Sequence, residues 1–207
     1  MKTNYLAVFL LLLGHSMSNA AEQHSLFDGK SFQGWEGDTN KSFRIEAGAI
    51  VGGSLSNAVP RNEFLATKRA YTNFVLELDW KVLGKGVNGG VQIRSARIPN
   101  HHEVSGYQAD LGDPSWWGCL YDESRRNKVL AQAPAEIAEK TIKREAWNHY
   151  TIRCEGKRIQ LSINGHATVD YTETESGIAD GGIIALQIHG GGPSEAWYKN
   201  IVVSELP

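Results

Sequence analysis

The sequence predicts an all-β sandwich or barrel, and three observations carry that prediction. Apolar and polar residues alternate in several short segments, which is the pattern of half-buried strands. The 22 glycines are spread along the chain, as turns between many strands require. Only the segment from Ala133 to Glu145 has helical character. Because each sheet must bury one apolar face, two such faces are expected to pack together.

The longest expected strand runs from Asn73 to Leu83. Its apolar residues, Trp80 among them, occupy every second position, and charged residues lie between them. Two later segments, Val91 to Arg94 and Tyr107 to Leu111, alternate in the same way. In each segment the polar side chains share one face, which predicts a polar sheet surface.

A hairpin is expected between two further alternating segments, Arg158 to Asn164 and Ala167 to Tyr171. The pair Asn164-Gly165 stands between them, and Asn-Gly is the strongest signal for a two-residue hairpin turn. These segments are therefore expected to pair as antiparallel neighbours.

Two last strands are expected, from Gly182 to His189 and from Ala196 to Val203, with the glycine-rich turn 190–193 between them. Gln187 and His189 are two positions apart, so they project from one face of the first of these strands. The polar outer surface of the curved sheet is expected to gather these side chains: Gln92, Arg94, Gln108, Asp110, Gln187 and His189.

The first 20 residues have the pattern of a cleavable signal peptide. Lys2 precedes an apolar stretch from Tyr5 to Leu13, and Ser18-Asn19-Ala20 supplies the small residues of a cleavage site, so cleavage is expected after Ala20. The apolar stretch is shorter than the roughly 20 residues that cross a bilayer. The prediction is a periplasmic or secreted protein without a membrane anchor, in which residues 21–207 form a single domain.

The charge pattern and the cysteines limit the partners and cofactors. The formal net charge is −2 with acids and bases interspersed, which argues against nucleic acid as a partner. Cys119 and Cys154 lack the spacing of a zinc site, so they are expected to be either buried thiols or one disulfide. His101-His102-Glu103 fixes no third ligand, and no metal or other cofactor is expected.

Two segments carry a family resemblance, Gly106-Tyr107-Gln108-Ala109-Asp110 and the run from Gly118 to Asn127. With Leu26 to Lys30, Glu63 to Leu65 and Ile184 to His189 in the same order, they resemble the 3-keto-disaccharide hydrolase domain family from Leu26 to the end of the chain. The resemblance implies a concanavalin A-like jelly-roll sandwich of two antiparallel sheets. The sequence departs from many relatives at Asn88-Gly89-Gly90 and Tyr198-Lys199.

The resemblance also implies an enzyme that cleaves 3-keto-disaccharides or other 3-keto-glycosides, and the signal-peptide pattern predicts that it is exported. A ketone at C3 acidifies the C2 hydrogen, so cleavage can proceed by loss of that proton, expulsion of the C1 substituent and addition of water. This route needs a base at C2, a donor or a metal for the enolate oxygen, and an acid for the leaving group. The alternative is a non-catalytic, lectin-like carbohydrate-binding module, because lectins share this fold.

His189, Asp110 and Glu123 are the candidates for proton transfer and orientation. Imidazole groups titrate near neutral pH, which suits proton transfer, although a structural or surface histidine would have the same pattern. Asp110 shares a face with Gln108, where a carboxylate beside an amide can bind sugar hydroxyls or orient a catalytic group. The alternative for this pair is a solvated strand face.

Glu123 belongs to a segment, Tyr121 to Arg126, that holds a phenol, two acids and two guanidinium groups. The alternative is a structural loop in which Glu123 and Arg125, two positions apart, form an ion pair. Trp116 and Trp117 lie in a loop composition and are candidates for stacking on a sugar, or else they plug the sandwich edge. The full substrate-binding set is Glu63, Arg94, Gln108, Trp116, Trp117, Tyr121, Arg125 and Gln187.

Overall fold

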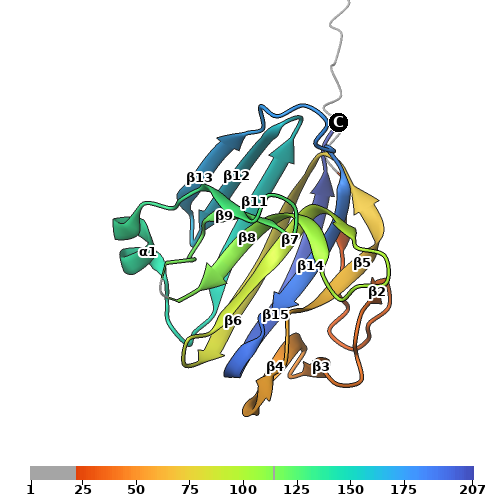
Figure 1. The fold of residues 1–207 in the computed structure, drawn as a ribbon, viewed down its shortest axis with the longest axis vertical. Coiled ribbons are helices and arrows are strands. Elements are labelled where there is room, and N and C mark those ends of the chain that lie inside the picture. The colour runs from red at the N-terminus through yellow and green to blue at the C-terminus, as the bar shows by residue number, and fades with distance from the viewer. Residues whose placement is uncertain (1–21, 114) are drawn as a thin grey trace, which may run out of the picture.

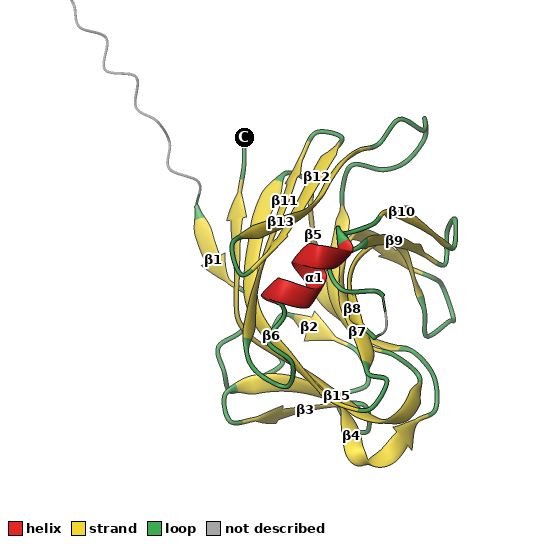
Figure 2. Ribbon diagram, turned by 90° about the vertical axis from the view of Figure 1, so that its left-hand side faces the viewer, coloured by secondary structure: helices red, strands yellow, loops and turns green. Residues whose placement is uncertain are grey.

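A computed structural model describes residues 22–113 and 115–207, so the predicted signal peptide and its cleavage site lie outside the described residues. Two antiparallel sheets pack face to face, and the short helix α1 (Ala135–Thr141) lies at one edge between them (Figures 1 and 2). The predicted all-β sandwich is confirmed. Within the described ranges, no helix has the length and hydropathy needed to span a bilayer.

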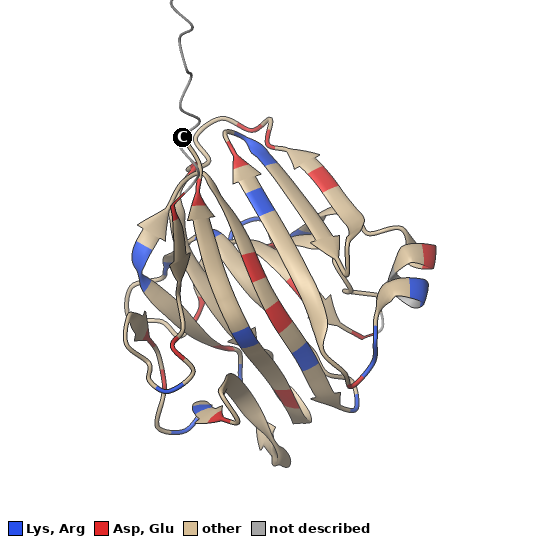
Figure 3. Ribbon diagram, turned by 180° about the vertical axis from the view of Figure 1, so that it is seen from behind, with Lys and Arg blue, Asp and Glu red and all other residues tan. Residues whose placement is uncertain are grey.

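The first sheet contains eight strands in the described part of the chain. Their order is β13 (His166–Thr172), β12 (Arg158–Ile163), β11 (Asn148–Glu155), β6 (Phe74–Gly84), β15 (Gly191–Glu205), β4 (Ala49–Val59) and β3 (Phe43–Glu46), and β1 (Gln23–Ser25) also pairs with β15. Glu77, Asp79 and Lys81 of β6 alternate with buried apolar residues, as predicted. Figure 3 shows acidic and basic residues spread over the outer face of this sheet.

The second sheet contains seven strands among the described residues. Their order is β10 (Lys128–Ala131), β9 (Leu120–Glu123), β8 (Val104–Gly112), β7 (Asn88–Arg97), β14 (Gly182–Ile188), β5 (Glu63–Tyr71) and β2 (Trp35–Glu36). Strands from distant parts of the sequence are therefore neighbours, since β14 lies between β7 and β5. This arrangement brings the polar positions of four strands onto one surface.

The predicted hairpin is formed by β12 and β13. Asn164 and Gly165 have φ values of 50° and 82°, the left-handed conformation that a two-residue turn of this kind requires. The helix is shorter than predicted, because the side chain of Asn164 donates to the carbonyl of Thr141 and that of Asn148 accepts from the Lys143 N–H. These backbone groups pair with side chains and do not continue the helix.

The core lies between the two sheets and contains Trp80, as its strand periodicity predicts. Tyr107 and Tyr150 enter the same core from opposite sheets. Cys119 and Cys154 are both buried and unbonded to each other, so they are the buried thiols of the first alternative. Burial raises the pKa of the Cys154 thiol to about 12, which keeps it protonated and unreactive.

Candidate functional site

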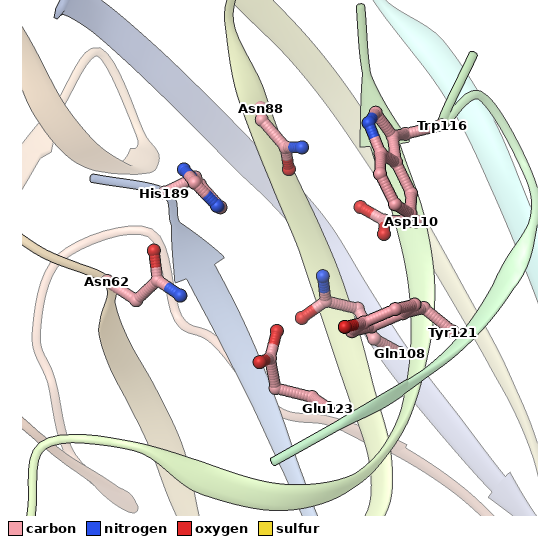
Figure 4. A pocket seen from close by; sticks show the side chains of 8 residues that line it. All are labelled: Asn62, Asn88, Gln108, Asp110, Trp116, Tyr121, Glu123 and His189. Atoms are coloured by element: carbon pink, nitrogen blue, oxygen red, sulfur yellow. The ribbon is translucent and has the colours of Figure 1, made fainter. Parts of the chain in front are cut away.

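A pocket of about 170 Å³ lies on the outer face of the seven-stranded sheet, away from the core. Figure 4 shows the side chains around it pointing toward a common space. The lining residues are Asn62, Asn88, Gln108, Asp110, Trp116, Tyr121, Glu123 and His189. Six of these are residues that the sequence predicts for catalysis or substrate binding, and none of the eight is a lysine or arginine.

Strand alternation explains why these side chains meet. Gln108 and Asp110 on β8 share the outer face with Tyr121 and Glu123 on β9, because the residues between them belong to the core or its border. Gln108 and Tyr121 are direct cross-strand partners. On the other side, Gly90 of β7 stands opposite Asp110, and a Cβ there would lie 2.8 Å from Cδ of Gln108. Glycine at this position leaves the room that the Gln108 side chain occupies.

Asp110 is the most deeply buried titratable residue of the pocket, with 2% of its surface exposed. Its Oδ1 accepts the Leu111 N–H at 3.0 Å. Burial raises the pKa of Asp110 to about 8, outweighing the lowering by the hydrogen bonds from Leu111 and Gln108, and the nearby charge of Glu123 adds to the rise. At neutral pH this carboxyl group is largely protonated and can donate a hydrogen bond.

Glu123 lies nearer the pocket mouth and is partly buried. The pKa of Glu123 is raised to about 7. Burial is the largest cause and the charge of Glu103 adds to it, while a hydrogen bond from Gln187 opposes the rise. Among the described residues no cation lies within ion-pair distance of Glu123. Near pH 7 this carboxyl group therefore exchanges between its ionised and protonated forms, as a general base must.

His189 is exposed at the rim, directly after β14. Its Nδ1 lies 2.6 Å from the carbonyl oxygen of Gly190, which can only accept, so Nδ1 carries a proton. Nε2 is then the ring nitrogen left to exchange a proton with a ligand. The backbone N–H of His189 donates to the carbonyl of Asn88, which ties the rim to β7.

Two asparagines line the pocket that the sequence analysis did not select. Asn62 accepts the Gly190 N–H through Oδ1, which leaves its amide nitrogen for a ligand. The Oδ1 of Asn88 is buried and has no hydrogen-bond partner among the described residues. Asn88 lies four positions before Gln92 on β7, so strand parity could have found it. Asn62 lies just before β5, outside any strand, so the alternation of polar and apolar residues could not have identified it.

Trp116 and Tyr121 form the aromatic wall of the pocket. Their rings meet edge to face with centroids 5.5 Å apart, and both side chains are partly exposed. An exposed indole next to polar groups is suited to stack on the apolar face of a sugar ring. Gln187, also predicted for substrate binding, is instead fully buried and contacts Gln108 and Glu123 from behind the pocket wall.

Arg94 was predicted on the same surface as Gln92, but the structure places it elsewhere. β7 has a bulge between Ile93 and Ala96, and Arg94 has a left-handed backbone with φ of 49°. The bulge breaks the alternation, so the guanidinium group turns to the end of the sandwich. There it donates to the carbonyls of Thr72 and Gly156, and it does not line the pocket.

Arg125 also lies outside the pocket, and its predicted alternative ion pair with Glu123 is wrong. β9 ends at Glu123, and Ser124 takes a left-handed conformation with φ of 49°. The turn directs Arg125 to the opposite face of β9, where its Nε is 2.8 Å from Asp122. Its guanidinium carbon lies 4.4 Å from the centre of the Tyr107 ring.

Glu63 and Trp117 are likewise outside the pocket. Glu63 is the cross-strand partner of Ile188, so it has the opposite parity to Gln187, and it lines a neighbouring open groove of about 750 Å³. Trp117 is 5% exposed and stacks on Trp80 with ring centroids 5.9 Å apart. The loop therefore separates the two indoles, with Trp116 at the pocket and Trp117 in the core.

This separation gives a stability prediction. Trp117→Ala is expected to lower the free energy of unfolding by about 3–5 kcal/mol, because it removes a buried ring from the core. Trp116→Ala should cost about 1 kcal/mol or less, since its ring is partly exposed. Urea denaturation of both variants measures the difference. Equal losses would contradict the assignment of Trp117 to the core.

The structure gives no sign of a metal site in the part of the chain it describes. There, no three or more His, Cys, Asp or Glu side chains are grouped as ligands. The ring of His102 instead contacts the carbonyl of Asn62 through Nδ1 at 2.9 Å and stacks with His101. These two histidines lie beside the open groove that Glu63 lines.

Solved structures of low sequence identity share the fold. A proposed glycosyl hydrolase from Parabacteroides distasonis has a TM-score of 0.70 at 20% identity, with 89% of this chain and 94% of that chain covered. A carbohydrate-binding module from Bacillus subtilis has a TM-score of 0.65 at 15% identity, with 83% and 96% covered. A Bacillus subtilis protein of unknown function with a galectin-like fold has a TM-score of 0.64 at 10% identity, with 90% and 96% covered. The predicted jelly-roll architecture is thereby confirmed.

Sequence comparison is more specific than these structural likenesses. No curated protein matches the chain. Residues 22–204 match the family described as the 3-keto-alpha-glucoside-1,2-lyase-like domain. The match spans the strands that build the pocket as well as both sheets. The chain therefore belongs to the family of 3-keto-alpha-glucoside-1,2-lyase-like domains.

Proposed function

We propose that this protein cleaves 3-keto-glycosides, including 3-keto-disaccharides, by elimination across C1 and C2 followed by addition of water. One observation carries the proposal. Two carboxyl groups that have no cationic partner in the described part of the chain, Asp110 and Glu123, have pKa values of about 8 and about 7 and converge on one pocket. Two groups that titrate close to neutral pH are suited to act as an acid and a base in one reaction. The family to which the chain belongs supports the same chemistry.

In this mechanism Glu123 is the base. Its ionised carboxylate takes the proton from C2 of the substrate, and the electron pair of that C–H bond forms the enolate of the C3 ketone. Asp110, protonated at neutral pH, donates a hydrogen bond to the enolate oxygen as negative charge develops there. The enolate then expels the C1 substituent, which gives an unsaturated ketone. Water adds at C1 to complete the net hydrolysis.

His189 is placed to protonate the leaving group. Its Nδ1 proton is engaged by Gly190, so transfer would take place through Nε2. The position of His189 at the exposed rim suits a group that meets the departing half of the substrate. Figure 4 shows Asn62 and Asn88 on either side of His189, and the amide nitrogen of Asn62 is placed to donate to a sugar hydroxyl.

The size of the pocket favours one sugar ring. Its 170 Å³ is below the range of about 300 Å³ or more that holds drug-sized ligands. The open groove of about 750 Å³ adjoins it through the consecutive residues Arg61, Asn62 and Glu63. We assign the 3-keto ring to the pocket and the leaving group to the side of this groove.

The direct test is incubation of the purified protein with 3-keto-trehalose and 3-keto-lactose. The assay follows the released monosaccharide and the unsaturated ketone, with and without added divalent metal ions. Release by the native protein and its loss in Glu123→Gln would support the proposal. If a panel of such substrates yields no product under either condition, the enzyme proposal is overturned.

A second candidate function is a carbohydrate-binding module without catalysis. The partly exposed Trp116 beside Tyr121 favours it, as does the shared fold with a carbohydrate-binding module. In this case glycans would bind without turnover, and Trp116→Ala would abolish the binding measured by calorimetry. Binding of a 3-keto-glycoside by the native protein without release of any product would distinguish this function from the enzyme.

We also propose that the protein acts in the periplasm or outside the cell, which rests on the signal-peptide pattern of residues 1–20. Sequencing of the N-terminus of the protein recovered from these compartments tests it. A mature chain that begins at Ala21 is expected. Recovery of the uncleaved chain in the cytoplasm would overturn the assignment.

A further inference from the structure

Behind the pocket wall, three glutamines and a serine form a continuous chain of hydrogen bonds across neighbouring strands. The hydroxyl of Ser95 lies 2.7 Å from Oε1 of Gln92, and Nε2 of Gln92 donates to Oε1 of Gln108 at 2.6 Å. Nε2 of Gln108 donates to Oε1 of Gln187 at 3.1 Å. All four side chains are at most 3% exposed, so water does not compete for these bonds.

The chain ends on the proposed base. Nε2 of Gln187 donates to Oε2 of Glu123 at 3.4 Å, the longest link. Every amide nitrogen in the chain faces the oxygen of the next residue, so all the amide dipoles have the same direction. Buried hydrogen bonds that are aligned in this way strengthen one another. The terminal N–H is therefore directed at a carboxylate that accepts it.

Packing explains why glutamines on non-adjacent strands can meet. Gln108 lies on β8 and Gln187 on β14, with β7 between them. The β7 residue between these strands at this level is Gly90, which pairs with Gln187 on one side and with Asp110 on the other. Because Gly90 has no side chain, both amides can lean over β7 and touch.

We propose that Gln187 is a positioning residue that holds the Glu123 carboxylate in its ionised, correctly directed form, and that Gln108, Gln92 and Ser95 act through it. The inference rests on the proposed role of Glu123 as the base. It assigns Gln187 to the support of a catalytic group and not to the substrate. Three features carry it: Gln187 is fully buried, it does not line the pocket, and its side-chain amide nitrogen donates to Glu123.

Other titratable groups also surround Glu123, and they stay the same when the chain of amides is altered. They are Asp110, Tyr121 and His189 in the pocket, Glu103 from the segment before β8, and Asp122, which directly precedes Glu123 in the sequence. A change in the titration of Glu123 on removal of Gln187 therefore reports the lost donor.

The experiment compares Gln187→Met, Gln92→Met and Gln160→Met with the native protein. Gln160 lies on β12 of the other sheet and serves as the matched control. A lost hydrogen bond to the ionised form raises the pKa of the carboxyl group. In Gln187→Met the acidic limb of kcat/KM is expected to move upward by roughly one pH unit. Gln92→Met should give a smaller shift in the same direction, and Gln160→Met none.

A second readout is independent of catalysis. Carbon NMR of the glutamate carboxyl groups, with the Glu123 signal assigned from Glu123→Gln, gives the titration of Glu123 directly. If the native protein cleaves no substrate, the proposed function fails while this titration still tests the role of Gln187. A loss of kcat/KM at all pH values with no shift of the limb or of the Glu123 titration would overturn the inference. If Gln187→Met does not fold, Gln92→Met and Ser95→Ala decide by the same criterion.

Discussion

Glu123→Gln is expected to lower kcat by about 10²- to 10⁴-fold, the usual contribution of a positioned general base. Glutamine has the same size, so the fold and the aromatic wall should be kept while the group that accepts the C2 proton is lost. Steady-state kinetics with a 3-keto-disaccharide measures the effect, and KM should change little. Asp110→Asn should reduce kcat less, because an amide N–H can still donate to the enolate oxygen.

The control for this variant is Glu155→Gln. Glu155 is 57% exposed at the end of β11, where its partner is Arg153 and the pocket is on the other sheet. Its activity should equal that of the native protein. If Glu123→Gln retained half of the native kcat, Glu123 would no longer be the base, and His189 would be the next candidate to test.

The same pair of carboxyl groups predicts the pH profile. Glu123 must be ionised and Asp110 protonated, so kcat/KM should rise as pH passes about 7 and fall as it passes about 8. Because the two groups interact, these apparent values belong to the pair. The part of the descending limb that belongs to Asp110 should disappear in Asp110→Asn. A profile that stays flat from pH 5 to 9 in the native protein would contradict the assignment.

Arg126→Met is expected to lower the free energy of unfolding by about 3 kcal/mol, since it leaves the buried Glu173 carboxylate without its cation and Asp122 with Arg125 alone. Arg126 donates to Asp122 and, at 2.7 Å, to Glu173. Asp122 is fully buried and Glu173 is 5% exposed. Tyr107 also donates to Glu173, at 2.6 Å, so the network joins the β9 turn to the segment after β13. Urea denaturation at pH 7 gives the loss.

The pH dependence of this loss has a defined sign. Burial raises the pKa of Glu173, but the hydrogen bonds from Arg126, Tyr107 and Tyr171 outweigh it and hold the pKa well below its ordinary value of 4.5. A carboxyl group with a lowered pKa in the folded state stabilises the protein above 4.5, and this contribution is lost as pH falls below it. The difference between the native protein and Arg126→Met should therefore narrow in acid.

An exposed ion pair provides the comparison for Arg126. Arg158 and Asp170 pair on β12 and β13, with both side chains more than half exposed. Arg158→Met is expected to cost at most about 1 kcal/mol, because water screens such pairs. Equal losses in Arg126→Met and Arg158→Met would show that burial of the Asp122 and Glu173 network does not determine its contribution.

Much of the site can be read from the sequence because strand alternation is a local property. Period-two patterning placed Gln108 with Asp110 and allowed Gln187 and His189 to be assigned to one face. In the structure Tyr121 and Glu123 share a face of β9 by the same alternation. Strand alternation fails to place Arg94 because β7 has a bulge at this position.

It fails again at Arg125, where a left-handed Ser124 turns the chain. The pattern of polar and apolar residues around these positions predicts neither the bulge nor the turn. As a result Arg94 donates to a backbone carbonyl and Arg125 to the Asp122 carboxylate, both outside the pocket. Trp116 and Trp117 have the same composition around them, so only the position of Trp80 on the opposing sheet decides which indole is buried.

The order of residues is enough to predict the fold class, the chemical types at the site and the faces of those strands that keep their alternation. Which of those groups meet depends on the tertiary structure, because β14 enters the sheet between β7 and β5 from a distant part of the chain. The tertiary structure also sets their protonation, since burial in one small pocket raises the pKa values of Asp110 and Glu123 together. Alternation depends on neighbours along the chain, whereas desolvation depends on neighbours in space.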